Sequence, residues 1–398
     1  MPFLNLLNYA LILVALLLAV PVVTFTVECL AALLPQRSNV NTLTGDRPKT
    51  AILIPAHNEA EQIGLVVQKA RKQLKPEELL VVIADNCQDN TAVIAKDAGA
   101  TVIERVDKVE KGKGYALDRG LRYLEDINPP EVVVFLDADC LMSEGAIANI
   151  ASLAYQTQRP VQAQYLMEQP DNPSLKDRVS AFALKVKNRV RFLGLNRLNA
   201  HSLLTGSGMA FPWSAIQKAS LVGAINADDM KLTVDLALED SIPTYCESAL
   251  VMGRLMKDQD AQSQRTRWEH GHLQMISREV PKLIKGFVKQ PRLDYLLLAL
   301  DISIPPLSLL VMLWFAATAI SVLSAVLLGI SWLSTIVLGT SGLLLFVAVI
   351  SVWSKFGTEE LPFKDLVAIP FYIVSKIPIY IKFIVNPEKG WFSTERDL

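Results

Sequence analysis

Long apolar runs occupy both ends of this chain, and only short ones lie between them. Residues 9–34 contain one acid and no base, and the run is long enough to cross a bilayer core, which takes roughly 20 apolar residues. Residues 302–328 and 331–353 are two further runs of this kind. From residue 50 to residue 270 no run reaches that length. The pattern predicts one water-exposed domain flanked by membrane-spanning helices.

The basic residues that follow the first run indicate its orientation. Arg37, Arg47 and Lys49 come after it, and the positive-inside rule places such a cluster in the cytoplasm. A cleaved signal peptide is the alternative, but it needs a basic start, and residues 1–8 contain neither Lys nor Arg. We expect an integral protein of the plasma (inner) membrane whose central domain is cytoplasmic.

Two segments near the end of the chain mix apolar and basic positions. Residues 271–292 place apolar side chains at steps of three and four, as on one helix face, with the basic residues mostly off that face. This pattern predicts an amphipathic helix on the membrane surface, kinked or restarted at Pro281. Three lysines interrupt residues 362–385, so this segment is either a third span or an interfacial helix. We favour the interface, because a lysine inside the bilayer is costly.

Composition agrees with this mixed organisation. The chain is 51% hydrophobic and 20% charged, which is more apolar than a soluble domain. A formal charge of −1 provides no field for nucleic acid, and the four cysteines lack the spacing of a zinc site. The predicted parts are a first membrane helix (1–36), a cytoplasmic domain (48–270), an interfacial helix (271–292), a membrane region of two spans plus the undecided segment (293–385), and a tail (386–398).

Short apolar strands alternate with helical stretches through the first half of the central domain. Continuous apolar strands, each followed by a helix, predict an α/β fold with a parallel sheet covered on both faces. In such sheets ligands bind beyond the carboxyl ends of the strands. The predicted strands are Thr50–Pro55, Leu79–Ala84, Thr101–Glu104 and Val132–Leu136, and the helices that follow them are Ala60–Leu74, Asn90–Ala98, Gly114–Leu124 and Glu144–Gln158.

Carboxylates gather at these carboxyl ends. Glu59 follows the first strand, Asp85 the second, and Asp137 and Asp139 the fourth. Four acids at one sheet edge repel one another unless a cation or a hydrogen-bonding ligand lies there, and oxygen-rich sites suit Mg²⁺ or Mn²⁺ bridging substrate phosphates. The sequence contains neither the G-x-G-x-x-G of dinucleotide-binding proteins nor a P-loop. The pattern therefore favours a metal-bridged phosphate ligand over NAD.

Five sequence blocks carry a family resemblance. They are IPAHNEA at 54–60, VVIADNCQDNTA at 81–92, VVVFLDADC at 132–140, LTGSGMAFPW at 204–213 and QRTRW at 264–268. With these blocks the chain resembles glycosyltransferase family 2, and more closely its membrane-bound, cellulose-synthase-like branch associated with exopolysaccharide synthesis. The resemblance covers residues 50–275. It implies a GT-A-type, Rossmann-like domain that binds a nucleotide sugar.

The resemblance also implies roles for single residues on the donor side. Asp85 would hold a uracil-type base or its ribose, and Lys113 would lie beside the donor. Asp137 and Asp139 would form the DxD motif, with Asp139 on the Mg²⁺ or Mn²⁺ that bridges the diphosphate. The remaining assignments are Pro55, His57 and Glu59 beside the base and ribose, Gln264, Arg267 and Trp268 closing over the donor and acceptor sugar, and Gly206, Ser207 and Gly208 on the acceptor side.

Two acidic positions compete for the role of catalytic base. In the family this base is the Asp of a T-E-D stretch between the TGSGM-like block and QxxRW. Glu239-Asp240 has the matching letters, whereas Asp229 starts a predicted helix that is followed by a turn and a strand, as the family layout requires. We assign the base to Asp229 and expect Asp240 in a solvated turn.

The predicted reaction is sugar transfer with inversion. One base would take the proton of an acceptor hydroxyl while that oxygen attacks the anomeric carbon, and no nucleophile on the opposite face is predicted. We expect a UDP-sugar donor and an exopolysaccharide or its lipid-linked precursor as acceptor. The alternatives are glycosylation of a membrane lipid such as ceramide or diacylglycerol and, in a different class, a catalytically inactive membrane scaffold.

Polar residues outside these motifs are assigned to the surface. A solvated charged face is the expected environment of the polar positions around the helical stretch 175–193. Two histidines after the QxxRW block are spaced two apart without a partner, so we expect surface residues and no metal site. These surface assignments comprise Asn188, Arg189, Arg191, Arg197, His270 and His272.

Overall fold

The computed structural model describes residues 2–35, 47–221, 228–254 and 258–385, and its chain divides into two compact units. Among the described residues, the sheet unit comprises 47–170, 199–221, 228–254 and 258–264. The helical unit comprises 2–35, 171–198 and 265–385. The predicted tail (386–398) and Arg37 lie outside the described residues.

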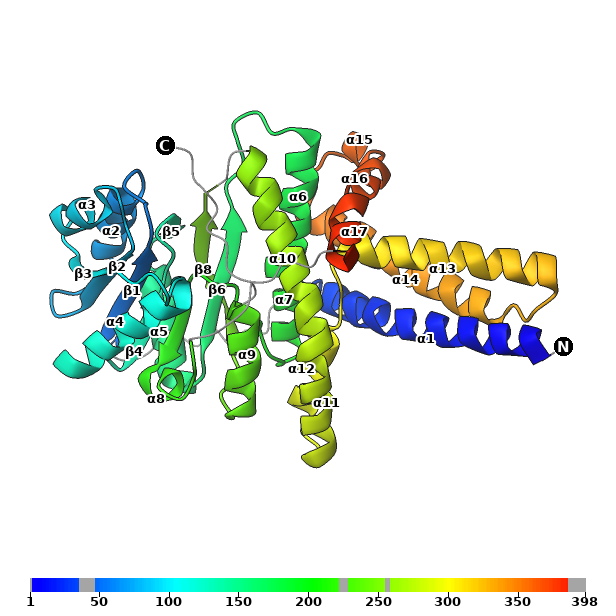
Figure 1. The fold of residues 1–398 in the computed structure, drawn as a ribbon, viewed down its shortest axis with the longest axis horizontal. Coiled ribbons are helices and arrows are strands. Elements are labelled where there is room, and N and C mark those ends of the chain that lie inside the picture. The colour runs from blue at the N-terminus through cyan, green and yellow to red at the C-terminus, as the bar shows by residue number, and fades with distance from the viewer. Residues whose placement is uncertain (1, 36–46, 222–227, 255–257, 386–398) are drawn as a thin grey trace. The chain divides into compact units, whose positions relative to one another are not determined.

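One mixed sheet forms the centre of the sheet unit (Figure 1). The four predicted strands are confirmed, and they pair in parallel in the order β3-β2-β1-β4. Beyond β4 the sheet continues as β7-β6-β8-β5, where β7 is antiparallel to both of its neighbours. The strands are β1 (Thr50–Ala56), β2 (Leu79–Asp85), β3 (Thr101–Arg105), β4 (Val132–Phe135), β5 (Cys140–Met142), β6 (Val161–Met167), β7 (Met209–Pro212) and β8 (Thr244–Gly253).

Helices cover both faces of this sheet, as predicted for its first half. Ile52 and Ile54 of β1 point to one face, where they join a buried cluster with α2 and α5. Leu53 points to the other face, into a cluster with α4 and α9. The helices of this unit are α2 (Ile63–Arg71), α3 (Thr91–Asp97), α4 (Lys113–Ile127), α5 (Ala146–Thr157), α8 (Trp213–Ile216) and α9 (Asp228–Leu238). The parallel strands between them therefore end at the same sheet edge, which is where ligands bind in such folds.

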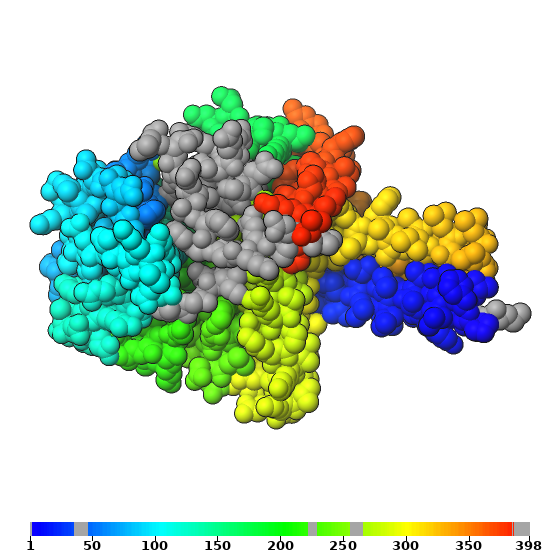
Figure 2. Space-filling model, in the orientation of Figure 1, coloured from blue at the N-terminus to red at the C-terminus, as the bar shows by residue number. Residues whose placement is uncertain are grey.

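Within the part of the chain that the structure describes, three helices of the helical unit are long and apolar enough to cross a membrane: α1 (Pro2–Ala31), α13 (Leu307–Leu328) and α14 (Leu333–Phe356). They match the three predicted spans and pack against one another. Large apolar side chains such as Phe315, Ile336 and Phe346 remain exposed on them, and Figure 2 shows the side chains of α1 and α13 lying along one another. An exposed apolar surface of this kind suits contact with lipid.

The predicted continuous domain of residues 48–270 is interrupted in the structure. Residues 171–198 form α6 (Leu175–Lys185), the π-helical turn η1 (Val186–Val190) and α7 (Arg191–Arg197), and they belong to the helical unit. Polar side chains explain this grouping, because Lys185 pairs with Glu360 and the Ser180 hydroxyl lies 3.0 Å from that of Tyr372. Contacts between residues so far apart in the sequence cannot be recognised in a local sequence pattern.

The segments predicted at the membrane surface are short helices. The stretch 271–292 is divided between the end of α10 (Asp258–Arg278) and α11 (Val280–Lys289), with Pro281 in the first turn of α11, where a proline is tolerated. Helix α12 (Leu293–Ile302) follows. The undecided stretch 362–385 forms α15 (Phe363–Leu366), α16 (Ile369–Ser375) and α17 (Ile377–Val385). None of these three helices is long enough to cross the hydrocarbon core.

Candidate functional site

Two carboxylates stand where β4 ends. Asp137 and Asp139 follow the strand, and together with Cys140 each offers one ligand atom within 4.8 Å of the others. Burial, and to a smaller extent the charge of Asp139, raise the pKa of the Cys140 thiol well above its usual range. The thiol therefore stays protonated and is not a ligand for a hard cation. The two carboxylates are the oxygen donors that Mg²⁺ and Mn²⁺ prefer, so these residues fit the predicted metal.

Lys113, in the first turn of α4, reaches into this corner. Its ammonium pairs with the Asp137 carboxylate and donates a hydrogen bond to the Gly206 carbonyl oxygen at 2.6 Å. Burial, the largest single effect, lowers the pKa of Lys113, but the charge and the hydrogen bond of Asp137 together with the charge of Asp229 raise that pKa overall. The lysine is therefore a fixed positive charge beside the DxD motif.

The loop before β7 has a left-handed backbone conformation at its two glycines. Gly206 and Gly208 have φ angles of +91° and +66°, in the left-handed region. A Cβ on Gly208 would lie 2.4 Å from the Val251 side chain, so the loop also approaches β8 closely. Ser207, between the glycines, is fully buried, and its hydroxyl accepts a hydrogen bond from the Asp137 amide at 3.0 Å. The predicted acceptor-side glycine–serine block thus contacts the DxD residues.

Of the two candidate bases, Asp229 lies at this loop. A Cβ built on Gly206 would be 3.6 Å from the Asp229 carboxylate and 3.6 Å from the Lys113 ammonium. Asp240 follows the opposite end of α9, roughly 16 Å away along a helix of this length. It is exposed and has a φ of +61°, in a turn. Helix α9 therefore brings Asp229 to Lys113 and Asp137.

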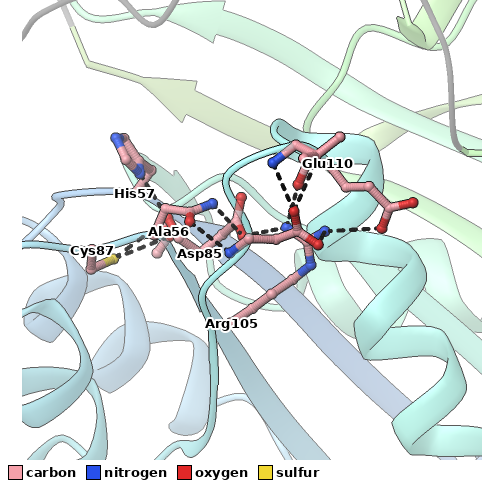
Figure 3. Close-up of polar contacts among 9 residues, drawn as sticks. Ala56, His57, Asp85, Cys87, Arg105 and Glu110 are labelled. Atoms are coloured by element: carbon pink, nitrogen blue, oxygen red, sulfur yellow. Dashed lines mark hydrogen bonds and ion pairs between the residues drawn. The ribbon is translucent and has the colours of Figure 1, made fainter.

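The ends of β1 and β2 form a second polar cluster (Figure 3). The His57 ring donates from Nδ1 to the Asp85 carbonyl oxygen at 2.7 Å. The buried Asp85 carboxylate accepts a hydrogen bond from the Arg105 guanidinium at 2.7 Å, and Arg105 also donates to the Glu110 carbonyl oxygen at 2.6 Å. Sequence reasoning missed Arg105, although its place at the end of β3, next to Asp85 in the parallel register, was a usable signal.

The other predicted donor residues lie on the same edge. Pro55 is in β1, paired with Ile83 of β2. The Glu59 amide donates to the Thr91 hydroxyl at 2.8 Å, which ties the loop after β1 to the start of α3. Both residues are partly exposed.

The boundary between the two units falls within the QxxRW block, after Gln264. Arg267 and Trp268 lie in α10, each half-buried, and belong to the helical unit. Gln264 is in the same helix, but its side chain lies outside the described part. Closure of these three residues over the sugars stays a prediction.

Sequence comparisons found a family model and a curated relative that match this chain. Residues 48–271, more than half of the chain, match the family model described as glycosyltransferase like family 2. A curated relative, 4,4'-diaponeurosporenoate glycosyltransferase of Staphylococcus aureus (strain MRSA252), is 30% identical over 123 residues, which are 30% of this chain and 32% of that protein. The alignment thus spans about a third of the relative's length.

Comparison with solved structures found one with the same fold and others that are less similar. A mannosyltransferase from Pyrobaculum calidifontis, in complex with GDP-Man and Mn²⁺, superposes with a TM-score of 0.58 at 16% identity, over 95% of this chain and 100% of that one. Glucosyl-3-phosphoglycerate synthase from Mycobacterium tuberculosis gives a TM-score of 0.42 at 17% identity, over 61% and 85% of the two chains. The first likeness identifies an α/β sheet of the GT-A type.

Proposed function

Because the chain belongs to glycosyltransferase family 2 and is therefore a nucleotide-sugar glycosyltransferase, we propose that it transfers a sugar with inversion from a UDP-sugar to an exopolysaccharide or its lipid-linked precursor. The observation that supports this most is the meeting of Asp137, Lys113 and Asp229 at one loop. A metal-binding motif, a fixed cation and a carboxylate base are the groups that such a transfer needs.

In the proposed mechanism each residue has a separate task. Asp229 removes the proton from the acceptor hydroxyl as its oxygen attacks the anomeric carbon. The bond from that carbon to the diphosphate breaks on the opposite side, so an α-linked donor yields a β-linked product. Asp137 and Asp139 would hold a divalent metal, and its positive charge would stabilise the leaving diphosphate. Lys113 adds positive charge at the same end, and Arg267 is a further candidate for this role.

Two alternatives remain for the acceptor and the class of function. A membrane lipid such as ceramide or diacylglycerol is the alternative acceptor. The three candidate spans favour this acceptor as much as a lipid-linked precursor, since they keep the protein in the membrane where such lipids are. Three spans are few for a processive synthase with its own channel, which favours addition of single sugars. An inactive scaffold is disfavoured by the ordered contacts between Lys113, Asp137 and Gly206.

The orientation that we propose places the sheet unit in the cytoplasm, where nucleotide sugars are made. Helix α11 supports attachment to the inner leaflet, because Ile284 and Val288 are exposed on one side and three lysines lie on the other. A cysteine at exposed Glu77, in a Cys87→Ser background whose other three cysteines are buried, tests this. It should react with an impermeant thiol reagent only after permeabilisation, and labelling of intact cells would reverse the orientation.

The proposed activity is tested on membranes that contain the full chain. They are incubated with a panel of nucleotide sugars that includes UDP- and GDP-linked donors, and products are identified by mass spectrometry. We expect one UDP-sugar to label a membrane-associated product, and Asp229→Asn to abolish that label. Absence of both transfer and donor hydrolysis with every sugar would contradict the proposal.

A further inference from the structure

A buried hydrogen-bond framework connects the residues of the proposed active site. Its centre is Gln162 on β6, whose side chain is fully buried. The Gln162 amide oxygen accepts from the Thr205 amide at 2.8 Å, and its nitrogen donates to the Ser207 carbonyl oxygen at 2.9 Å. One side chain therefore holds both sides of Gly206, the residue whose left-handed backbone makes the turn.

The first arm of the framework leads to the proposed donor end. The Ser207 hydroxyl accepts from the Asp137 amide, and the Gly206 carbonyl accepts from the Lys113 ammonium. Both contacts come from the turn that Gln162 holds. The position of the DxD backbone and the direction of the lysine therefore depend on this turn.

The second arm leads to the proposed base. Thr233, fully buried on α9, accepts a hydrogen bond from the Leu204 amide at 2.9 Å, and the same hydroxyl donates to the Asp229 carbonyl oxygen at 3.0 Å. Because a hydroxyl can accept and donate at once, it joins the loop to the first turn of the helix. Valine has nearly the same shape but can form neither bond.

We propose that Gln162, Ser207 and Thr233 are positioning residues that fix the separation between the diphosphate end and the base through the loop 204–207. The proposal rests on the proposed function. A buried polar group without a partner destabilises the fold by more than its hydrogen bond contributes to stability. We therefore expect the loop to move when a partner is removed. A small displacement of reacting groups is enough to slow transfer strongly.

The two arms predict losses in different kinetic parameters. Thr233→Val removes the link between the Leu204 amide and the first turn of α9, so the base shifts relative to the loop, whereas Gln162 still holds Thr205 and Ser207. We therefore expect kcat to fall by about 10- to 100-fold while the affinity for UDP is kept. Thr233→Ser keeps the hydroxyl and should restore kcat to within about threefold of the wild type. Ser207→Ala frees the Asp137 amide, so the affinity for UDP and metal should fall by about tenfold, with a smaller effect on kcat.

Gln162→Met tests the centre of the framework, and Gln164→Met is its matched control. Gln164 is also buried on β6, but its amide oxygen accepts from the Tyr245 hydroxyl of β8 and not from an amide of the loop. We expect Gln162→Met to reduce both kcat and UDP affinity, and Gln164→Met to change neither. Thermal unfolding is recorded for every variant, because a purely structural role would lower all parameters in step with the melting temperature.

The outcomes separate this inference from the proposed function. Wild-type protein that transfers no sugar would contradict the proposed function and this inference with it. An active wild type with an equally active Thr233→Val variant would overturn the inference alone. So would a Thr233→Ser variant as slow as Thr233→Val, or losses of kcat and UDP affinity that do not divide between the two arms.

Discussion

The Arg191 guanidinium donates a hydrogen bond to the Glu28 carboxylate at 2.6 Å, although 163 residues separate the two and both side chains are buried. Arg191 also pairs with buried Asp301 and donates to the Asp301 carbonyl oxygen at 3.2 Å. One cation thus joins α1, α7 and α12 within the helical unit. We predicted a solvated face for Arg191, and also for Asn188, which is buried too, so both assignments were wrong.

Removal of this cation should destabilise the protein strongly. In Arg191→Met the carboxylates of Glu28 and Asp301 stay buried without a counter-charge, which costs about 3–5 kcal/mol in the free energy of unfolding. Lys176→Met, at an exposed position of α6, is the control and should change the free energy of unfolding by less than about 0.5 kcal/mol. Denaturant titration in detergent measures both, and equal stability of the two variants would contradict the prediction.

A second prediction concerns the backbone contact beside this pair. A Cβ on Gly194 of α7 would lie 1.8 Å from the Glu28 carbonyl oxygen, so α7 and α1 can approach this closely only through a glycine. Gly194→Ala should therefore lower stability by about 1–3 kcal/mol or more. Gly339→Ala on α14, whose Cβ would meet nothing within 4 Å, is the matched control. We expect a change of less than about 1 kcal/mol there, measured by thermal unfolding.

The stability of the protein should fall in mild acid because of His272. This buried ring donates to the Ile302 carbonyl oxygen at 3.1 Å, and burial first, then nearby Lys187, lowers its pKa from 6.5 to about 3, while Arg191 and Asp301 act on it in opposite directions. Between these values the unfolded chain binds a proton that the folded chain does not. The free energy of unfolding should therefore decrease as the pH is lowered through this window, by up to about 1.4 kcal/mol per pH unit.

A neutral replacement tests the assignment of this pH dependence. His272→Gln keeps a hydrogen-bond donor for Ile302 but does not titrate, so it should flatten the stability profile between pH 3 and 6.5. Denaturant titrations across this range measure the slope. An unchanged slope would show that other groups cause it.

The catalytic base is tested by a pair of substitutions. Asp229→Asn should reduce the transfer rate by about 10²–10⁴-fold and leave UDP affinity largely intact, because the base contacts the attacking hydroxyl and not the nucleotide. Asp240→Asn should retain activity, since asparagine readily adopts the left-handed conformation of this exposed turn. Transfer rate and UDP affinity are measured on both. An inactive Asp240→Asn beside an active Asp229→Asn would exchange the two roles.

Activity should require a divalent metal. Asp139→Asn removes one of the two carboxylates at the end of β4, so donor affinity should weaken, and chelation should abolish turnover of the wild type. Asp126→Asn, an exposed acid on α4, is the control and should retain full activity. Turnover that continues in excess chelator would disprove the metal requirement.

The local pattern of the chain determined the strands β1 to β4, the helices between them and the three long apolar helices. Each of these is visible in consecutive residues, because a buried strand is a continuous apolar run and a spanning helix a longer one. Asp85 and Asp137 follow such strands directly, so the carboxyl-end rule places both of them at one sheet edge. Arg105 was not predicted, because its role depends on the hydrogen bond to Asp85, which lies on a different strand.

The tertiary structure alone decided where polar side chains outside these patterns lie. His270 and His272 were predicted on the surface, but both are buried and bonded to carbonyl oxygens of Ile379 and Ile302. Helical periodicity shows which face is apolar, but it cannot show whether a distant segment covers the polar face. Burial of Arg191 depends on Glu28 and Asp301, and that of Thr233 on Leu204. Such pairings over long sequence separations become visible only when the chain is folded.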